Sequence, residues 1–219
     1  RGGAAQEGEL LPQEAVVVRE LPPQRGLALL AKSGLLDLWL PELRPMVGCG
    51  QNRHHAHDVW RHTLEVVRFA PAEPALRWAG LLHDAGKPGT RSVGPDGEVH
   101  FYGHEARSLE LTEGIFERLK ASHALRKSTL ALIRHHGTHP TESWSDAACR
   151  RLLGRLEADG LTLDAWAAFR LADQRAKGLA WELHLAEHTK LMARLESLRA
   201  ARPALSIRDL ALDGAALMR

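Results

Sequence analysis

The stretch LLHDAGKP (residues 81–88) places a histidine, an aspartate and a lysine at the end of an apolar run. Lys87 lies four residues after His83 and three after Asp84, so on a helix all three share one face. The two leucines that precede them can pack such a helix into a core. Burying imidazole and carboxylate groups without partners costs several kcal/mol. The stretch therefore predicts a helix that presents a pair of possible ligands, His83 and Asp84, together with a cation, Lys87.

The segments on either side of this stretch are almost all helical in periodicity. We expect helices at 26–40, 58–69, 73–86, 104–121, 124–136, 144–158, 163–177 and 180–200. The Gly- and Pro-rich segment 87–103 is expected to be a loop with a small hairpin around GPDG (94–97). No alternating run is long enough for a sheet, so the predicted fold class is all-α, a helical bundle with additional flanking helices.

Composition narrows the class of protein further. The chain has 219 residues, 44% of them apolar, which is enough to bury a core, and its net charge of +2 gives no strong field for a polyanion. Its two cysteines, Cys49 and Cys149, are far apart and in no metal-type spacing, which favours a reducing, cytoplasmic compartment. No run approaches the roughly 20 apolar residues of a membrane span, and no signal peptide is visible. We therefore expect no membrane partner, and the pattern assigns no oligomeric state.

Histidines are the unusual feature, since the chain holds 13 of them. Any one histidine beside an apolar stretch is more often a satisfied core or surface residue than a ligand. Several of them in one helical chain, together with Asp84 and Asp173, are harder to dismiss. Imidazole and carboxylate ligands without thiolate suit a divalent transition metal: Fe, Mn, Ni, Co or Zn, with Mg as a further candidate.

The spaced set His62 … His83-Asp84 … Asp173 resembles the signature of the HD superfamily of metal-dependent phosphohydrolases. The resemblance implies an HD domain at the centre of the helical bundle. It also implies that these four residues bind the first metal ion, with Asp84 bridging to a second.

The flanking sequence narrows the resemblance. LRWAGLLHDAGKPGTR (76–91), FYGHEARS (101–108) and ALIRHH (131–136) resemble the HD-containing C-terminal half of bacterial tRNA nucleotidyltransferases (CCA-adding enzymes) and the related poly(A) polymerases. The resemblance covers roughly residues 20–219. That family also has a nucleotidyltransferase head with Gly-Ser followed by paired aspartates, and no such stretch occurs here. This chain alone is therefore not expected to add nucleotides.

The resemblance implies a second metal site, and position along the helices predicts roles for Lys87 and Arg107. The second metal ion is expected to bind Asp84 with His104, His135 and His136. Asp84 and Lys87 are the predicted catalytic residues, and Lys87, taken as an exposed lysine at a helix end, would neutralise charge on the phosphoryl group. Arg107, three residues after His104, is expected to bind substrate phosphate together with Lys87.

The resemblance also predicts the domain organisation of the chain. We expect a loose N-terminal segment at 1–19, a neck- or body-like helical segment at 20–50, the HD metal-binding domain at 51–179, and C-terminal tail helices at 180–219. The first residue is Arg1 rather than methionine, and the final SIRDLALDGAALMR resembles a motif after which the family continues. These ends predict a piece of a longer protein.

Three hypotheses for function remain open. The first is a metal-dependent phosphohydrolase acting on nucleotide or RNA phosphoesters, such as 2′,3′-cyclic nucleotides, 2′-nucleotides or RNA ends. The second is a tRNA-binding body and tail portion of a nucleotidyltransferase or poly(A) polymerase, with a non-catalytic HD domain. The third is a structural helical domain whose histidines are relics. The retention of every metal-type position favours the first, which can coexist with tRNA binding.

Overall fold

The computed structural model describes residues 22–52 and 56–201, and over these ranges the chain is built of helices with one short hairpin. The helices are α2 (Pro23–Ser33), α3 (Leu35–Trp39), the 3-10 helix η1 (Pro41–Met46), α4 (Val59–Phe69), α5 (Pro74–Leu82), α6 (Lys87–Thr90), α7 (His104–Arg118), α8 (His123–His136), α9 (Asp146–Ala158), α10 (Leu163–Ala176) and α11 (Trp181–Ala200). The predicted all-α class is confirmed. The predicted segment 1–19 and the tail beyond residue 201 lie outside the described residues.

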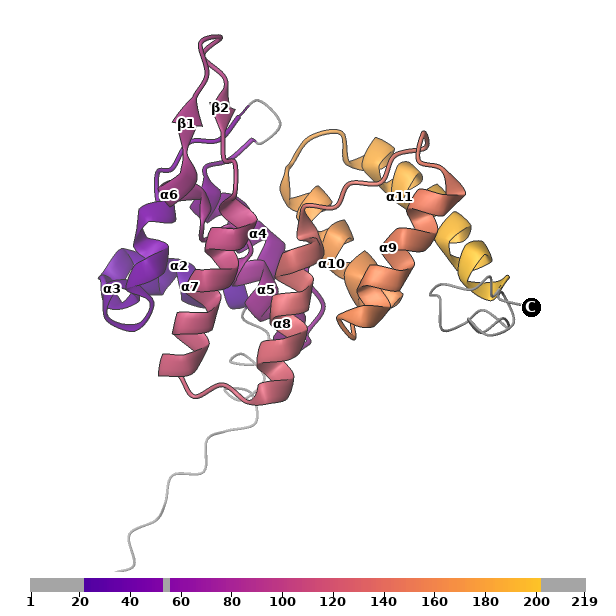
Figure 1. Cartoon of the computed structure of the whole chain (residues 1–219). Helices are drawn as coiled ribbons and strands as arrows, with labels where there is room; N and C mark the ends of the chain where they lie inside the picture. Colours follow the sequence, from indigo (N-terminus) through magenta and orange to yellow (C-terminus); the bar gives the residue numbers. More distant parts are fainter. Residues whose placement is uncertain (1–21, 53–55, 202–219) are drawn as a thin grey trace, which may run out of the picture.

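Helices α4, α5, α8 and α10 pack against one another at the centre of the fold (Figure 1). Their apolar faces form one core, in which Val66, Leu82, Ile133 and Phe169 are almost fully buried. Four of the described helices, α4, α8, α9 and α10, begin at a side-chain N-cap. Asp58, for example, accepts a hydrogen bond of 2.7 Å from the Arg61 backbone N–H, so α4 starts where its N-cap predicts.

The other helices cover this centre from two sides. α7 packs against α8, α2 packs against α4, and α11 packs against α9 and α10, so that α9 and α11 lie together on the side remote from α2 and α3 (Figure 1). Both cysteines are free thiols. Among the described residues, no helix combines the length and apolar character that crossing a membrane requires.

Two predicted helices are interrupted. The segment 26–40 is two helices, because Gly34 takes a left-handed conformation (φ +79°) between them. The segment 73–86 ends at Leu82, and the chain makes consecutive turns before α6 begins at Lys87. Pro88 explains the second break, since a continuing helix would need its missing N–H and would push its ring against the carbonyl of Asp84.

The predicted hairpin is confirmed. β1 (Ser92–Val93) and β2 (Val99–His100) are antiparallel, with Ser92 opposite His100. The hairpin projects from the body beside α6 (Figure 1). Its second strand leads directly through residues 101–103 into α7, so the hairpin and the start of α7 are one continuous piece of chain.

The turn at 83–86 is held tightly against α7. The Gly86 backbone N–H donates to Ser108 Oγ at 2.9 Å. A Cβ built on Gly86 would lie 2.3 Å from the His104 carbonyl oxygen and 2.7 Å from the Ser108 backbone nitrogen. Only glycine fits here, because the neighbouring atoms are backbone and cannot move aside.

We therefore expect Gly86→Ala to lower the free energy of unfolding by about 1–3 kcal/mol, the usual scale for overpacking. Gly89→Ala is the matched control, since a Cβ at this position would meet no atom within 4 Å, and it should be neutral or slightly stabilising. Urea unfolding followed by circular dichroism measures both. Equal midpoints for the two variants would contradict the close packing of the turn.

Candidate metal centre

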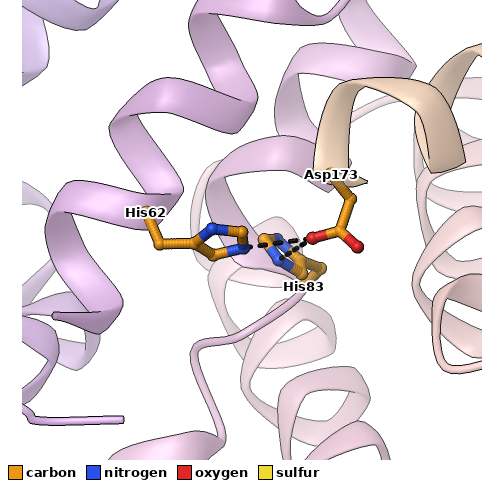
Figure 2. Close-up of side chains that lie close together, drawn as sticks. All are labelled: His62, His83 and Asp173. Atoms are coloured by element: carbon orange, nitrogen blue, oxygen red, sulfur yellow. Dashed lines mark hydrogen bonds and ion pairs between the residues drawn. The ribbon is translucent and has the colours of Figure 1, made fainter. Parts of the chain in front are cut away.

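Three ligating side chains from three separate elements meet in the core. Figure 2 shows His62 from α4, His83 from the turn after α5, and Asp173 from α10 converging on one point. Asp173 Oδ1 lies 3.0 Å from His62 Nε2 and 3.8 Å from His83 Nε2. All three residues are buried, so the centre of the bundle carries a polar cluster that apolar packing does not explain.

A second group of ligating side chains lies next to the first. It consists of Asp84, His104 at the start of α7, and His136 at the end of α8. Asp84 Oδ1 lies 3.6 Å from His104 Nε2 and 3.8 Å from His136 Nε2. The two ring nitrogens lie 3.3 Å from each other.

The carboxylate of Asp84 faces both groups. While Oδ1 faces His104 and His136, Oδ2 lies 3.2 Å from His83 Nε2 and 3.7 Å from His62 Nε2. Among the described residues, His83 Nε2 and Asp84 Oδ2 are buried without a hydrogen bond of good geometry, although Oδ2 forms an ion pair of 2.8 Å with Lys87 Nζ. Such atoms are costly unless something binds them, and one carboxylate with an oxygen toward each group is suited to bridging two cations.

Backbone carbonyls orient three of the histidines. In His83, His104 and His136, Nδ1 lies 3.0, 2.8 and 2.6 Å from the carbonyl oxygen three residues earlier. A carbonyl only accepts, so each Nδ1 must donate, and in the neutral ring each Nε2 is left with its lone pair. The lone pairs of His104 and His136 then face each other, an arrangement that a cation between them stabilises. Metal-binding histidines are oriented in this way, and the residues present fit a metal.

The electrostatics of Asp84 and His136 agree with ligand chemistry, whereas burial of His83 is outweighed by the charge of Asp84, which raises the pKa of His83, so that a metal ion would have to displace a proton from that ring. Burial by itself raises the pKa of Asp84, but the charges of His83 and Lys87 outweigh it and hold that pKa well below its usual range. Burial, reinforced by the charge of His83, lowers the pKa of His136 to about 3. At neutral pH the carboxylate is therefore ionised and the imidazole of His136 is neutral, which are the forms that bind metal.

Lys87 differs from the exposed lysine expected from the sequence. It is only 7% exposed, its Nζ lies 2.8 Å from Asp84 Oδ2, and it donates to Gln51 Oε1 at 2.7 Å. Its ammonium also lies 5.3 Å from the centre of the Phe101 ring. The break after Leu82 causes this burial, because the turn folds Lys87 back over Asp84 instead of leaving it at a helix end.

The structure does not bring His135 to either group. Its Nε2 lies 2.7 Å from Asp159 Oδ2, at the end of α9. Adjacent residues of a helix point about 100° apart, so only one of the pair His135–His136 can face the centre. We therefore remove His135 from the expected ligand set.

Arg107 is also not at the centre. Its guanidinium is bound to Glu110 at 2.5 Å on the outer face of α7, where the side chain is half exposed. An offset of three residues from His104 keeps it on a neighbouring part of the helix surface but directs the long side chain toward solvent. The geometry thus gives no support to its expected role in binding phosphate.

A cavity of about 360 Å³ opens onto the two groups. Its lining includes His83, Asp84, His104, His136 and Asp173. Among the further lining residues that sequence reasoning did not assign to the site are His139 and Lys177. Lys177 follows Asp173 by four residues, a helical spacing that could have indicated this contact. In the structure its Nζ lies 3.5 Å from Asp173 Oδ2, in a pair similar to that of Lys87 with Asp84. The centre is therefore reached from a pocket lined by two ammonium groups, those of Lys87 and Lys177.

Comparison with known proteins agrees with this geometry. The model of the HD domain family matches residues 59–176, more than half of the chain, and the chain therefore belongs to the HD domain family. The matched range contains every residue of both ligating groups.

Individual relatives are tRNA nucleotidyltransferases. The chain is 40% identical over 146 residues to an A-adding tRNA nucleotidyltransferase of Deinococcus radiodurans, an alignment covering 64% of this chain and 33% of that protein. It is 34% identical over 166 residues to a CC-adding tRNA nucleotidyltransferase of Thermus thermophilus, covering 72% of this chain and 38% of that protein. The resemblance to the HD half of these enzymes is thus confirmed, and the chain matches only about a third of the length of these curated relatives.

The neighbouring histidines give a direct test of the second group. His136→Ala removes a ligand and should lower the bound metal from about two equivalents to about one at saturating manganese. His135→Ala is the matched control, because it loses only the contact with Asp159 and should keep both equivalents. Elemental analysis of the folded, desalted variants gives the counts. Loss of metal from the His135 variant but not from the His136 variant would contradict the assignment.

Proposed function

We propose that this chain is a metal-dependent phosphohydrolase that acts on phosphoesters of nucleotides or RNA ends, such as 2′,3′-cyclic or 2′-phosphates. The observation that carries the proposal is the placement of Asp84, with one carboxylate oxygen toward each ligating group and the ammonium of Lys87 beside it. We include in this proposal a cytoplasmic location and the division of the chain into a neck, an HD domain at 51–179 and a tail.

The ligands divide into two sets. His62, His83 and Asp173 would hold one divalent ion, His104 and His136 would hold a second, and Asp84 would bridge them. Fe, Mn, Ni, Co and Zn all suit these nitrogen and oxygen donors, and Mg is a further candidate. Two bound divalent ions activate a water and polarise phosphoryl oxygens, which is the chemistry of binuclear phosphoesterases.

The protein's own groups supply the remaining requirements. Lys87 and Lys177 place positive charge on the cavity wall, where it would neutralise charge that builds on the phosphoryl group. Lys87 is held in place by Asp84 and Gln51 before substrate arrives, so no side-chain entropy is lost at that step. Burial of the ligands keeps the centre dry except through the cavity, and this strengthens each charge interaction.

The second candidate is an RNA-holding portion whose HD domain does not hydrolyse phosphoesters. The observation that favours it is the identity of the relatives, which are tRNA nucleotidyltransferases matched over about a third of their length. In that case tRNA would be a binding partner rather than a substrate.

Lys87→Met tests the role of the buried ammonium while keeping most of the side-chain volume. All metal ligands remain, so we expect unchanged metal content and a kcat reduced by about 10²–10³, the scale for one electrostatic contact to a transition state. The matched control is Lys32→Met, an exposed lysine of α2 remote from the cavity. The assay uses 2′,3′-cyclic AMP with manganese, nickel, cobalt or magnesium.

Full activity of the Lys87 variant would remove this residue from the reaction. If the metal-loaded wild type hydrolyses no phosphoester in the panel but binds a tRNA acceptor stem with a strong salt dependence, the second candidate replaces the first.

A further inference from the structure

Two aromatic rings are stacked at the mouth of the cavity. His100, the last residue of β2, and Tyr102 have ring centroids 5.2 Å apart and an angle of only 12° between their planes. Both line the cavity. Tyr102 is 78% exposed, so an aromatic ring with a parallel partner faces solvent in the cavity that holds the ligating groups.

Apolar packing does not account for this exposure. The described core is made from the helices of the bundle, and Tyr102 contributes nothing to it. An exposed aromatic ring that keeps a fixed, parallel partner presents a preformed stacking surface without further loss of side-chain entropy. Tyr102 is also the only tyrosine of the chain.

The stacked pair is built into the same short piece of chain as the metal centre. Residues 100–104 run from His100 to the ligating residue His104, whose Nδ1 donates to the Phe101 carbonyl oxygen at 2.8 Å. The ring of Phe101, between the two stacked residues, lies 5.3 Å from the ammonium of Lys87. The stacked rings therefore line the same cavity as Lys87 and Asp84, where the phosphate of a bound substrate would lie.

We propose that His100 and Tyr102 form a base-stacking platform that selects nucleotides over other phosphoesters. This inference rests on the proposed phosphohydrolase function, and it names the part of the substrate that the protein recognises. A nucleobase fits the platform because it offers a flat π-face about as wide as the rings. Base–aromatic stacking tolerates any base sequence, so the platform favours a nucleotide or an RNA end without selecting one base. The cavity volume of about 360 Å³ is within the range of small-molecule sites.

The first test measures binding without any reaction. With ring-labelled tyrosine, the single Tyr102 gives one set of ring signals in an NMR spectrum of the zinc-loaded protein. Adenosine 5′-monophosphate should shift these signals upfield through the ring current of the stacked base. Ribose 5-phosphate, which lacks only the base, should leave them in place. Equal effects of the two compounds, or no effect of either at millimolar concentration, would overturn the platform.

The second test measures selectivity. We compare kcat/KM for 2′,3′-cyclic AMP with that for the cyclic phosphate of 1-O-methylribose, which has no base. Tyr102→Ala should lower this preference by about 10- to 100-fold, the range for losing one stacked base. Tyr102→Phe should retain the preference. Val93→Ala, an exposed hairpin position outside the cavity, should leave both substrates unaffected.

The outcomes separate the two proposals. A base-dependent NMR shift without hydrolysis of either substrate would keep the platform as a nucleotide-binding site and reject the phosphohydrolase function. Hydrolysis with a preference that Tyr102→Ala does not change would keep the function and reject the platform.

Discussion

The buried carboxylate of Asp84 is the constraint on which the structure depends. It is almost fully buried, and the groups around it are the four histidines of the ligating groups and one lysine, Lys87. A buried charge of this kind is tolerated only when it is paired and bound. Each element that supplies a ligating side chain must therefore reach the Asp84 carboxylate. The elements that end or pass there are α4, α5, α7, α8 and α10.

The turn at 83–86 makes this convergence sterically feasible. Pro88 prevents α5 from continuing, and Gly86 lets the turn lie against the backbone of α7 at a distance where any Cβ would collide. The same turn brings Lys87 over Asp84 and α7 close enough for His104 to face its carboxylate. Local backbone geometry, packing and the chemistry of the centre are thus coupled through two residues that carry no functional group of their own.

Much of this could be predicted from residue pattern. Helical periodicity and capping residues gave the element types, and the spaced His62, His83, Asp84 and Asp173 marked residues that the structure brings together. Spacing could not predict the direction in which a side chain points or how deeply it is buried. Two adjacent histidines look alike in sequence, yet a helix turns them about 100° apart, and His135 faces Asp159 instead. The burial of Lys87 accompanies a helix that ends four residues earlier than periodicity predicts, with the turn after it packed against α7.

The central proposal is that Asp84 would bridge two metal ions. Anomalous diffraction from crystals of the manganese-loaded protein tests it most directly. We predict two anomalous peaks about 3.5–4 Å apart, one among His62, His83 and Asp173, the other beside His104 and His136, with the Asp84 carboxylate between them. A single peak at saturating manganese, or a peak that lies outside these two groups, would contradict the account.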